Sequence, residues 1–83
     1  MITKQDISTR IGSRIRSFRN KRQWSIEELA SQSGLDYSQL SRIERGKINT
    51  SVYHLYVISK ALKLELGQIF DGIFNDIEDP KEF

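Results

Sequence analysis

Apolar residues recur along this chain with the spacing of amphipathic helices. The first group is separated by four, four and three positions, so it forms one stripe on a helix of 3.6 residues per turn; it consists of Ile7, Ile11, Ile15 and Phe18. Thr3 stands where a capping residue would begin this helix. The polar segment 20–23 has no apolar partner in the pattern, and we expect it to be a connection.

Two shorter helices follow, separated by a turn. Ser25 and Glu28 form the S-x-x-E pattern of a capping box, which marks a helix start. Gly34 offers the left-handed conformation that ends helices. Asp36 begins the next helix, with Gln39 at the matching position of a second box.

The second half of the chain predicts two more helices. After a polar loop, Thr50 or Ser51 caps a fourth helix, whose apolar residues are Val52, Leu55, Ile58, Ala61 and Leu62. A fifth helix begins near Leu66 and is interrupted or ended near Gly72. Because no strand alternation of useful length occurs, we expect one all-α domain of five helices over residues 1–83.

The segment 26–45 carries the most specific pattern in the sequence. Apolar residues stand at its positions four, ten, fifteen and eighteen, with Ala30 at position five and Gly34 at position nine. A side chain longer than that of Ala30 would push apart two helices that cross at close to a right angle, and Gly34 turns the chain in a conformation that a Cβ disfavours. Together these restrictions predict a helix-turn-helix.

The sequence resembles the helix-turn-helix family of lambda repressor and Cro over about residues 10–70. The resemblance rests on the segments WSIEELASQSGL, SRIERGK and ISKALKL. Among small members, the chain is similar to controller proteins of restriction–modification systems and to phage or plasmid repressors. The family implies a lambda-repressor-like fold of five helices, a homodimer, and sequence-specific binding of double-stranded DNA at a two-fold symmetric operator.

This resemblance makes the third helix the recognition helix. Four side chains match the family's base-contacting positions: Tyr37, Ser38, Gln39 and Arg42. Arg42 suits guanine O6 and N7, and Gln39 suits adenine N6 and N7. Tyr37 departs from the glutamine often found there and suits a thymine methyl group or a phosphate. The alternative is that all four are solvated residues on a surface helix.

Phosphates are expected to bind at helix N-termini and at small polar groups beside the groove. The candidates are Ser25, Lys47, Asn49, Thr50 and Ser51. Ile26 stands where the family often has a glutamine, and it cannot make the hydrogen bond expected of that residue.

Arg19 and Glu44 match family positions that form an ion pair between the first helix and the recognition helix. Such a pair would fix the angle at which the recognition helix is presented. The alternative is that Arg19 faces phosphate and Glu44 is solvated.

The C-terminal part holds more apolar residues than one short helix needs for its own core. The expected dimer contacts are Ile69, Ile73, Phe74 and Ile77, and the alternative is that they only close the core. The segment 71–83 is acidic and contains apolar anchors. The rival function is therefore an antitoxin-type module that binds a partner protein through this tail.

Charge is unevenly distributed, although the formal net charge is only +2. Residues 1–24 carry seven cationic side chains and one acidic one, residues 25–70 balance, and residues 71–83 carry five acidic side chains and one cationic one. A basic front favours a polyanion site at that end. The alternative is that the charged side chains at both ends of the chain are simply solvated.

Composition removes several other classes of function. The chain has no cysteine, which excludes disulfides, zinc fingers and thiol catalysis, and the lone histidine His54 predicts no metal site. No cofactor motif or catalytic arrangement stands out, so we expect no enzyme. No signal peptide or membrane span is recognisable, and a cytoplasmic location is expected. An activator would also need RNA polymerase as a partner.

Overall fold

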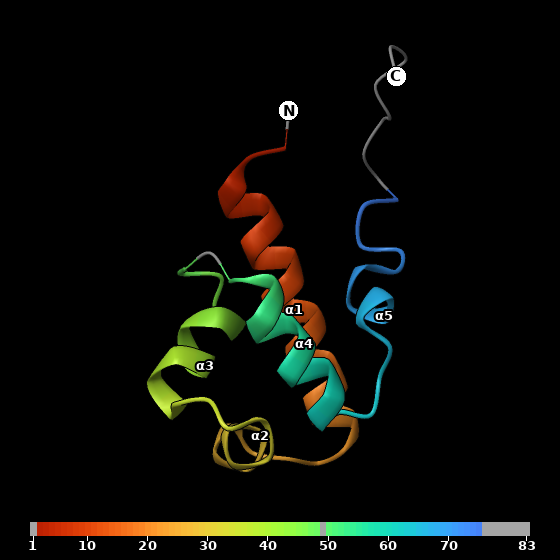
Figure 1. Cartoon of the computed structure of the whole chain (residues 1–83). Helices are drawn as coiled ribbons and strands as arrows, with labels where there is room; N and C mark the ends of the chain where they lie inside the picture. Colours follow the sequence, from red (N-terminus) through yellow and green to blue (C-terminus); the bar gives the residue numbers. More distant parts are fainter. Residues whose placement is uncertain (1, 49, 76–83) are drawn as a thin grey trace.

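The computed structural model describes residues 2–48 and 50–75. In chain order these residues form α1 (Lys4–Lys21), α2 (Ile26–Ser33), α3 (Tyr37–Glu44), α4 (Val52–Ala61) and α5 (Leu66–Phe70) (Figure 1). No strand occurs in this range, and the expectation of an all-α fold with five helices is confirmed. None of these helices combines the length and the apolar character that a membrane span requires.

The helix starts follow local capping. Thr3 and Asp6 bond reciprocally, each backbone N–H donating to the other side chain at 3.0 and 3.1 Å. The hydrogen bond from the backbone N–H of Thr3 lowers the pKa of the Asp6 carboxyl. Ser25 and Glu28 form the same reciprocal box at the start of α2. The caps at Thr3 and Ser25 therefore begin α1 and α2 where the sequence predicted.

The turn between α2 and α3 depends on one backbone conformation. Gly34 has φ +78° and donates its N–H to the carbonyl oxygen of Ala30 at 2.9 Å. That left-handed geometry ends α2 and lets α3 begin three residues later. Ala30 is buried, as expected for the small residue of a helix-turn-helix.

The helix limits at Asp36 and near Gly72 agree with the expectation, although the second capping box does not form. Asp36 stands at the N-cap of α3, but its side chain makes no capping hydrogen bond, and the Gln39 side chain contacts His54 in α4. The fifth helix ends at Phe70, close to Gly72, where an end or an interruption was expected. Residues 71–75 are turns, and Gly72 has φ +76°.

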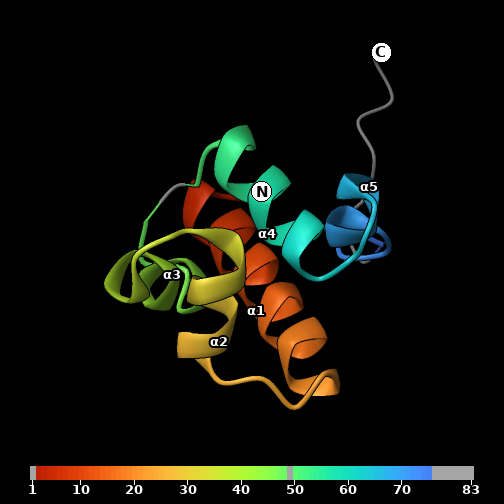
Figure 2. The ribbon, with the colours of Figure 1, turned by 60° about the horizontal axis from the view of Figure 1, so that its bottom comes forward.

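The helices surround one apolar core. α1 and α4 run through the middle of the molecule, while α3 and α5 lie on opposite sides of them in both views (Figures 1 and 2). α3 packs chiefly on α1 and α2, and α5 packs on α4 and α1. The buried apolar side chains are Ile11, Ile15, Leu29, Ala30, Leu40, Ile43, Leu55, Ile58, Leu62 and Ile69. α3 contributes Leu40 and Ile43 to this core and is thus held by its inner side.

At Gly12, α1 lies directly against the backbone at the end of α3. A Cβ at this position would overlap the backbone carbonyl oxygens of Ile43 and Glu44. Backbone cannot move aside as a flexible side chain can, so only a glycine lets the two helices come this near. The packing of α3 against α1 therefore requires a residue without a Cβ at position 12.

We predict that Gly12→Ala destabilises the protein while Gly67→Ala does not. The first adds a Cβ against backbone, and overpacking of this kind costs about 1–3 kcal/mol or more. The second meets nothing within 4 Å and improves helix propensity, so it is expected to add up to about 1 kcal/mol. Urea unfolding of both variants measures the difference, and equal midpoints would contradict this account of α1–α3 packing.

Candidate nucleic-acid interface

α3 has a buried side and a polar, exposed side. Leu40, Ile43 and Glu44 point inward and are at most 3% exposed. Tyr37 is 51% exposed, and Ser38 and Arg42 are also exposed. Three of the four expected base-contacting residues therefore lie where a major groove can reach them, on a helix of a size that the groove accepts.

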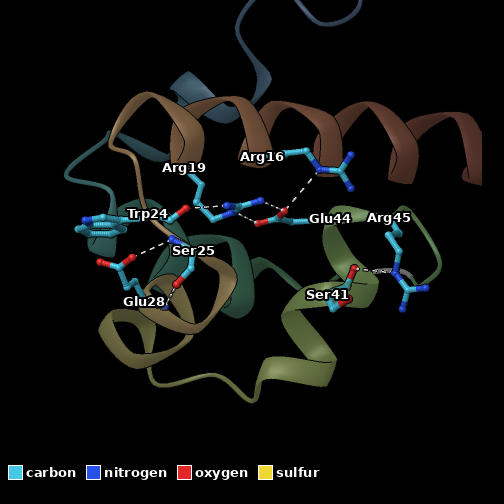
Figure 3. A network of polar contacts seen from close by, with 8 residues as sticks. All are labelled: Arg16, Arg19, Trp24, Ser25, Glu28, Ser41, Glu44 and Arg45. Atoms are coloured by element: carbon cyan, nitrogen blue, oxygen red, sulfur yellow. Dashed lines mark hydrogen bonds and ion pairs between the residues drawn. The ribbon is translucent and has the colours of Figure 1, made fainter.

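The inner side of α3 is fixed to α1 by a bidentate ion pair. Arg19 donates from Nε to Glu44 Oε2 at 2.7 Å and from Nη2 to Glu44 Oε1 at 3.0 Å (Figure 3). The Glu44 side chain is fully buried and that of Arg19 is 12% exposed. The hydrogen bonds to Glu44 raise the pKa of the Arg19 guanidinium above its usual value.

The same guanidinium also holds the chain that enters α2. Arg19 Nη1 donates to the carbonyl oxygen of Trp24 at 2.6 Å, next to the Ser25 cap (Figure 3). One side chain thus links α1, the start of α2 and the end of α3. This arrangement matches the role that the resemblance implied for Arg19 and Glu44.

A second cation approaches the buried carboxylate. Arg16 Nε lies 3.5 Å from Glu44 Oε1, with its side chain 48% exposed. Figure 3 shows it reaching Glu44 from the same helix as Arg19. Arg16 lies one turn before Arg19, at a helical spacing that brings both to one face, but the sequence analysis assigned it no role.

Gln39 differs from the other expected base contacts because it is half-buried. Its Nε2 lies 3.0 Å from Nε2 of His54, near the start of α4. No sequence signal linked these two residues, which are fifteen positions apart.

The expected phosphate contacts differ in how their polar groups are used. The Ser25 hydroxyl accepts from the N–H of Glu28, and the Ser51 hydroxyl accepts from the N–H of His54. Lys47 is exposed. Thr50 is half-buried, and its hydroxyl oxygen is enclosed with no hydrogen-bond partner among the described residues. Asn49 lies outside the described residues.

The start of α4 is a better place for a phosphate than the start of α2. The first turn of α2 carries Glu27 and Glu28, whereas that of α4 has no acidic residue. Carboxylates at a helix N-terminus occupy the positive end of the helix dipole and repel a second anion. Phosphate contacts are therefore favoured near Lys47 and Ser51 over Ser25.

The basic front of the chain is not a single phosphate-facing patch. Arg10 donates to the carbonyl oxygen of Ile73 at 2.8 Å, and Arg22 donates to that of Leu62 at 3.0 Å. Arg19 is committed to Glu44. Three of the seven cations of residues 1–24 therefore bond within the fold, and a polyanion site at that end stays a prediction for the others.

The expected dimer contacts are also divided. Ile69 is fully buried in the core, so it offers no surface to a partner, which corrects its assignment. Ile73 and Phe74 are half-buried, and Phe70 is 37% exposed beside them in the sequence. Ile77 lies outside the described residues.

No group of three His, Asp or Glu side chains that could hold a metal ion occurs among the residues that the structure describes.

Comparisons with known proteins agree with this geometry. The family model described as helix-turn-helix matches residues 15–69. The HTH-type transcriptional regulator SlrR of Bacillus subtilis (strain 168) is 45% identical over 63 residues, which are 75% of this chain and 41% of SlrR. The control protein C.MunI of a Mycoplasma species is 38% identical over 69 residues, which are 82% of this chain and 93% of that protein.

A solved structure shows the same fold over a similar range. The restriction-modification controller protein C.AhdI from Aeromonas hydrophila superposes with a TM-score of 0.74 at 35% identity. The match covers 76% of this chain and 96% of that one. The matched residues thus make up nearly the whole C.AhdI chain. In contrast, the present chain spans less than half the length of SlrR.

We predict that Arg19→Ala lowers the free energy of unfolding by about 3 kcal/mol, because it leaves the Glu44 carboxylate buried with an incomplete partner. Arg16→Ala is the matched control. It removes a half-exposed cation from the same carboxylate and is expected to cost less than about 1 kcal/mol. Chemical unfolding measures both, and equal losses would mean that Arg19 is no more than a surface ion pair.

Proposed function

This chain belongs to the helix-turn-helix family of DNA-binding transcriptional regulators, and we propose that it acts as a homodimer on a two-fold symmetric operator. Its α3 helices would enter the major groove at two half-sites about one helical turn apart, roughly 34 Å. In each half-site, Tyr37, Ser38, Gln39 and Arg42 would face the bases.

One observation carries this proposal. Between Tyr37 and Lys47 the sole acidic residue is Glu44, and its side chain is buried and paired with Arg19. The exposed charges of this stretch are therefore all positive, at Arg42, Arg45 and Lys47. A rigid helix with a basic, polar outer side suits a groove bordered by phosphates.

The segment after α5 is the proposed dimer surface. Ile73 and Phe74 remain partly accessible, and Phe70 exposes 37% of its surface next to them. α5 lies on the side of the molecule away from α3 (Figures 1 and 2). A contact there would leave both recognition helices free.

The biological role that we propose is that of a restriction–modification controller or another small repressor. Support comes from coverage, because the compared residues make up 93% of C.MunI and 96% of the C.AhdI chain. The rival role is an antitoxin-type module whose segment 71–83 binds a protein.

Selection from a random duplex library at about 150 mM salt tests the proposal, since phosphate contacts alone give strong binding at low salt. We expect the sequenced bound pool to contain a two-fold symmetric motif. A pool without enrichment would refute operator recognition and favour the protein-binding role.

On the selected site, Arg42→Ala is expected to lose about 1–3 kcal/mol of discrimination at one guanine per half-site and to retain non-specific binding. Lys47→Ala is the matched control. It removes an exposed cation beside the same helix, and it should weaken all sequences alike while reducing the salt slope by about 1 per half-site. If both variants weaken all sequences equally, Arg42 does not read a base.

We further predict that Phe74→Asp shifts the protein toward monomer in sedimentation experiments. A charge in an apolar contact must be desolvated when the partner binds. Tyr53→Asp is the control, because Tyr53 is 66% exposed on α4 and lies outside the proposed surface. If the oligomeric state of Phe74→Asp equals that of the wild type, the interface lies elsewhere.

A further inference from the structure

The contact between Gln39 and His54 ties the recognition helix to α4. Their Nε2 atoms are 3.0 Å apart, within hydrogen-bond distance. α3 packs chiefly on α1 and α2, so this bond joins it to a helix outside its main packing partners. Of the two residues that it joins, Gln39 is expected to contact a base and His54 is not.

Two nitrogen atoms share a hydrogen bond only when one of them carries the proton and the other a lone pair. The amide nitrogen of Gln39 is a donor with no acceptor capacity. It must therefore donate to His54 Nε2, and the His54 proton must reside on Nδ1. The contact thus selects one neutral tautomer of the ring.

The other ring nitrogen has no partner. His54 Nδ1 is enclosed, and no group among the described residues bonds to it. A proton on Nδ1 is therefore left without an acceptor, which costs free energy, and the bond to Gln39 has to compensate for this cost.

His54 is itself held in place. Its backbone N–H donates to the Ser51 hydroxyl at 3.1 Å, and its ring meets that of Tyr53 edge-on, with centroids 6.0 Å apart. It belongs to α4, which packs on α2 and α5. The His54 backbone is therefore anchored in the first turn of α4, and its ring contacts both Tyr53 and Gln39.

We propose that His54 is a specificity-determining residue that orients the Gln39 amide for adenine. This inference rests on the proposed DNA-reading function. A primary amide has two N–H groups, and His54 takes one of them. The carbonyl oxygen and the second N–H remain, which are the acceptor and donor that adenine N6 and N7 require.

The order of these two groups matters as much as their presence. Rotating the amide by half a turn exchanges oxygen and nitrogen, so that an N–H would face the adenine N6 amine and the match would be lost. The rotated amide would place its oxygen against His54 Nε2, and it would bond there only if the ring proton moved from Nδ1 to Nε2. The order of the two amide groups is therefore coupled to the tautomer of His54.

The test is a library selection with four variants beside the wild type. Gln39→Ala identifies the motif position that Gln39 reads. His54→Phe keeps a flat ring without nitrogen atoms, and it should reduce the adenine preference at that same position about three- to tenfold, because the freed glutamine must then be ordered on binding. In the double variant, His54→Phe should add nothing to Gln39→Ala. Tyr53→Phe, which keeps the ring contact with His54, should change no single position.

Several outcomes would overturn this role. One is an unchanged position in His54→Phe, and another is a loss spread evenly over the motif. A third is an effect that persists in the Gln39→Ala background. His54→Ala replaces the phenylalanine variant if thermal melting shows that the larger ring disturbs folding. A wild-type pool without any motif would overturn the proposed function itself, and this inference with it.

The tautomer provides a readout that needs no DNA. Nitrogen-15 NMR of the wild-type imidazole should show His54 protonated at Nδ1, and Gln39→Ala should release this preference. A ring protonated at Nε2 in the wild type would mean that the amide is reversed, and the proposed order of acceptor and donor would be wrong.

Discussion

The carboxylate of Glu44, buried at the inner side of the recognition helix, is the constraint on which the rest of the site depends. A buried charge is tolerated when its partner is close and its remaining lone pairs are bonded. Arg19 meets both conditions with two hydrogen bonds to Glu44, and its third bond reaches Trp24. The same guanidinium balances the buried charge and holds the chain that enters α2. The orientation of α3 therefore depends on where α1 places Arg19.

This constraint also shapes the outer surface. The one negative charge between Tyr37 and Lys47, that of Glu44, is turned inward and paired with Arg19, whereas Arg42, Arg45 and Lys47 remain exposed. The chain has a formal net charge of only +2. Because the Glu44 carboxylate is buried, the outer side of α3 nevertheless carries a positive potential. Two other cations serve a different purpose, since Arg10 in α1 and Arg22 directly after it donate hydrogen bonds to the carbonyl oxygens of Ile73 and Leu62.

Features controlled by neighbours along the chain were predictable from the sequence, and those controlled by distant partners were not. The five helices, the Ser25–Glu28 box and the Gly34 turn depend on residues three or four apart. The pairing of Arg19 with Glu44 required the family resemblance. The pattern at Asp36 and Gln39 was equally local, yet Gln39 bonds to His54 instead, because a capping box and a tertiary contact compete for one amide. Gly12 gave no signal, since its role appears only when the backbone of α3 lies over it.

The Gln39–His54 bond has a consequence for how a recognition surface of this kind is inherited or redesigned. Ser38 and Arg42 are exposed, and in the proposed interface each could be exchanged without disturbing a contact to another helix. Position 39 is different, because its side chain shares a hydrogen bond with position 54, which lies outside the recognition helix. Transplanting the outer residues of α3 onto another scaffold would therefore transfer an incomplete reading code unless the α4 residue travels with them.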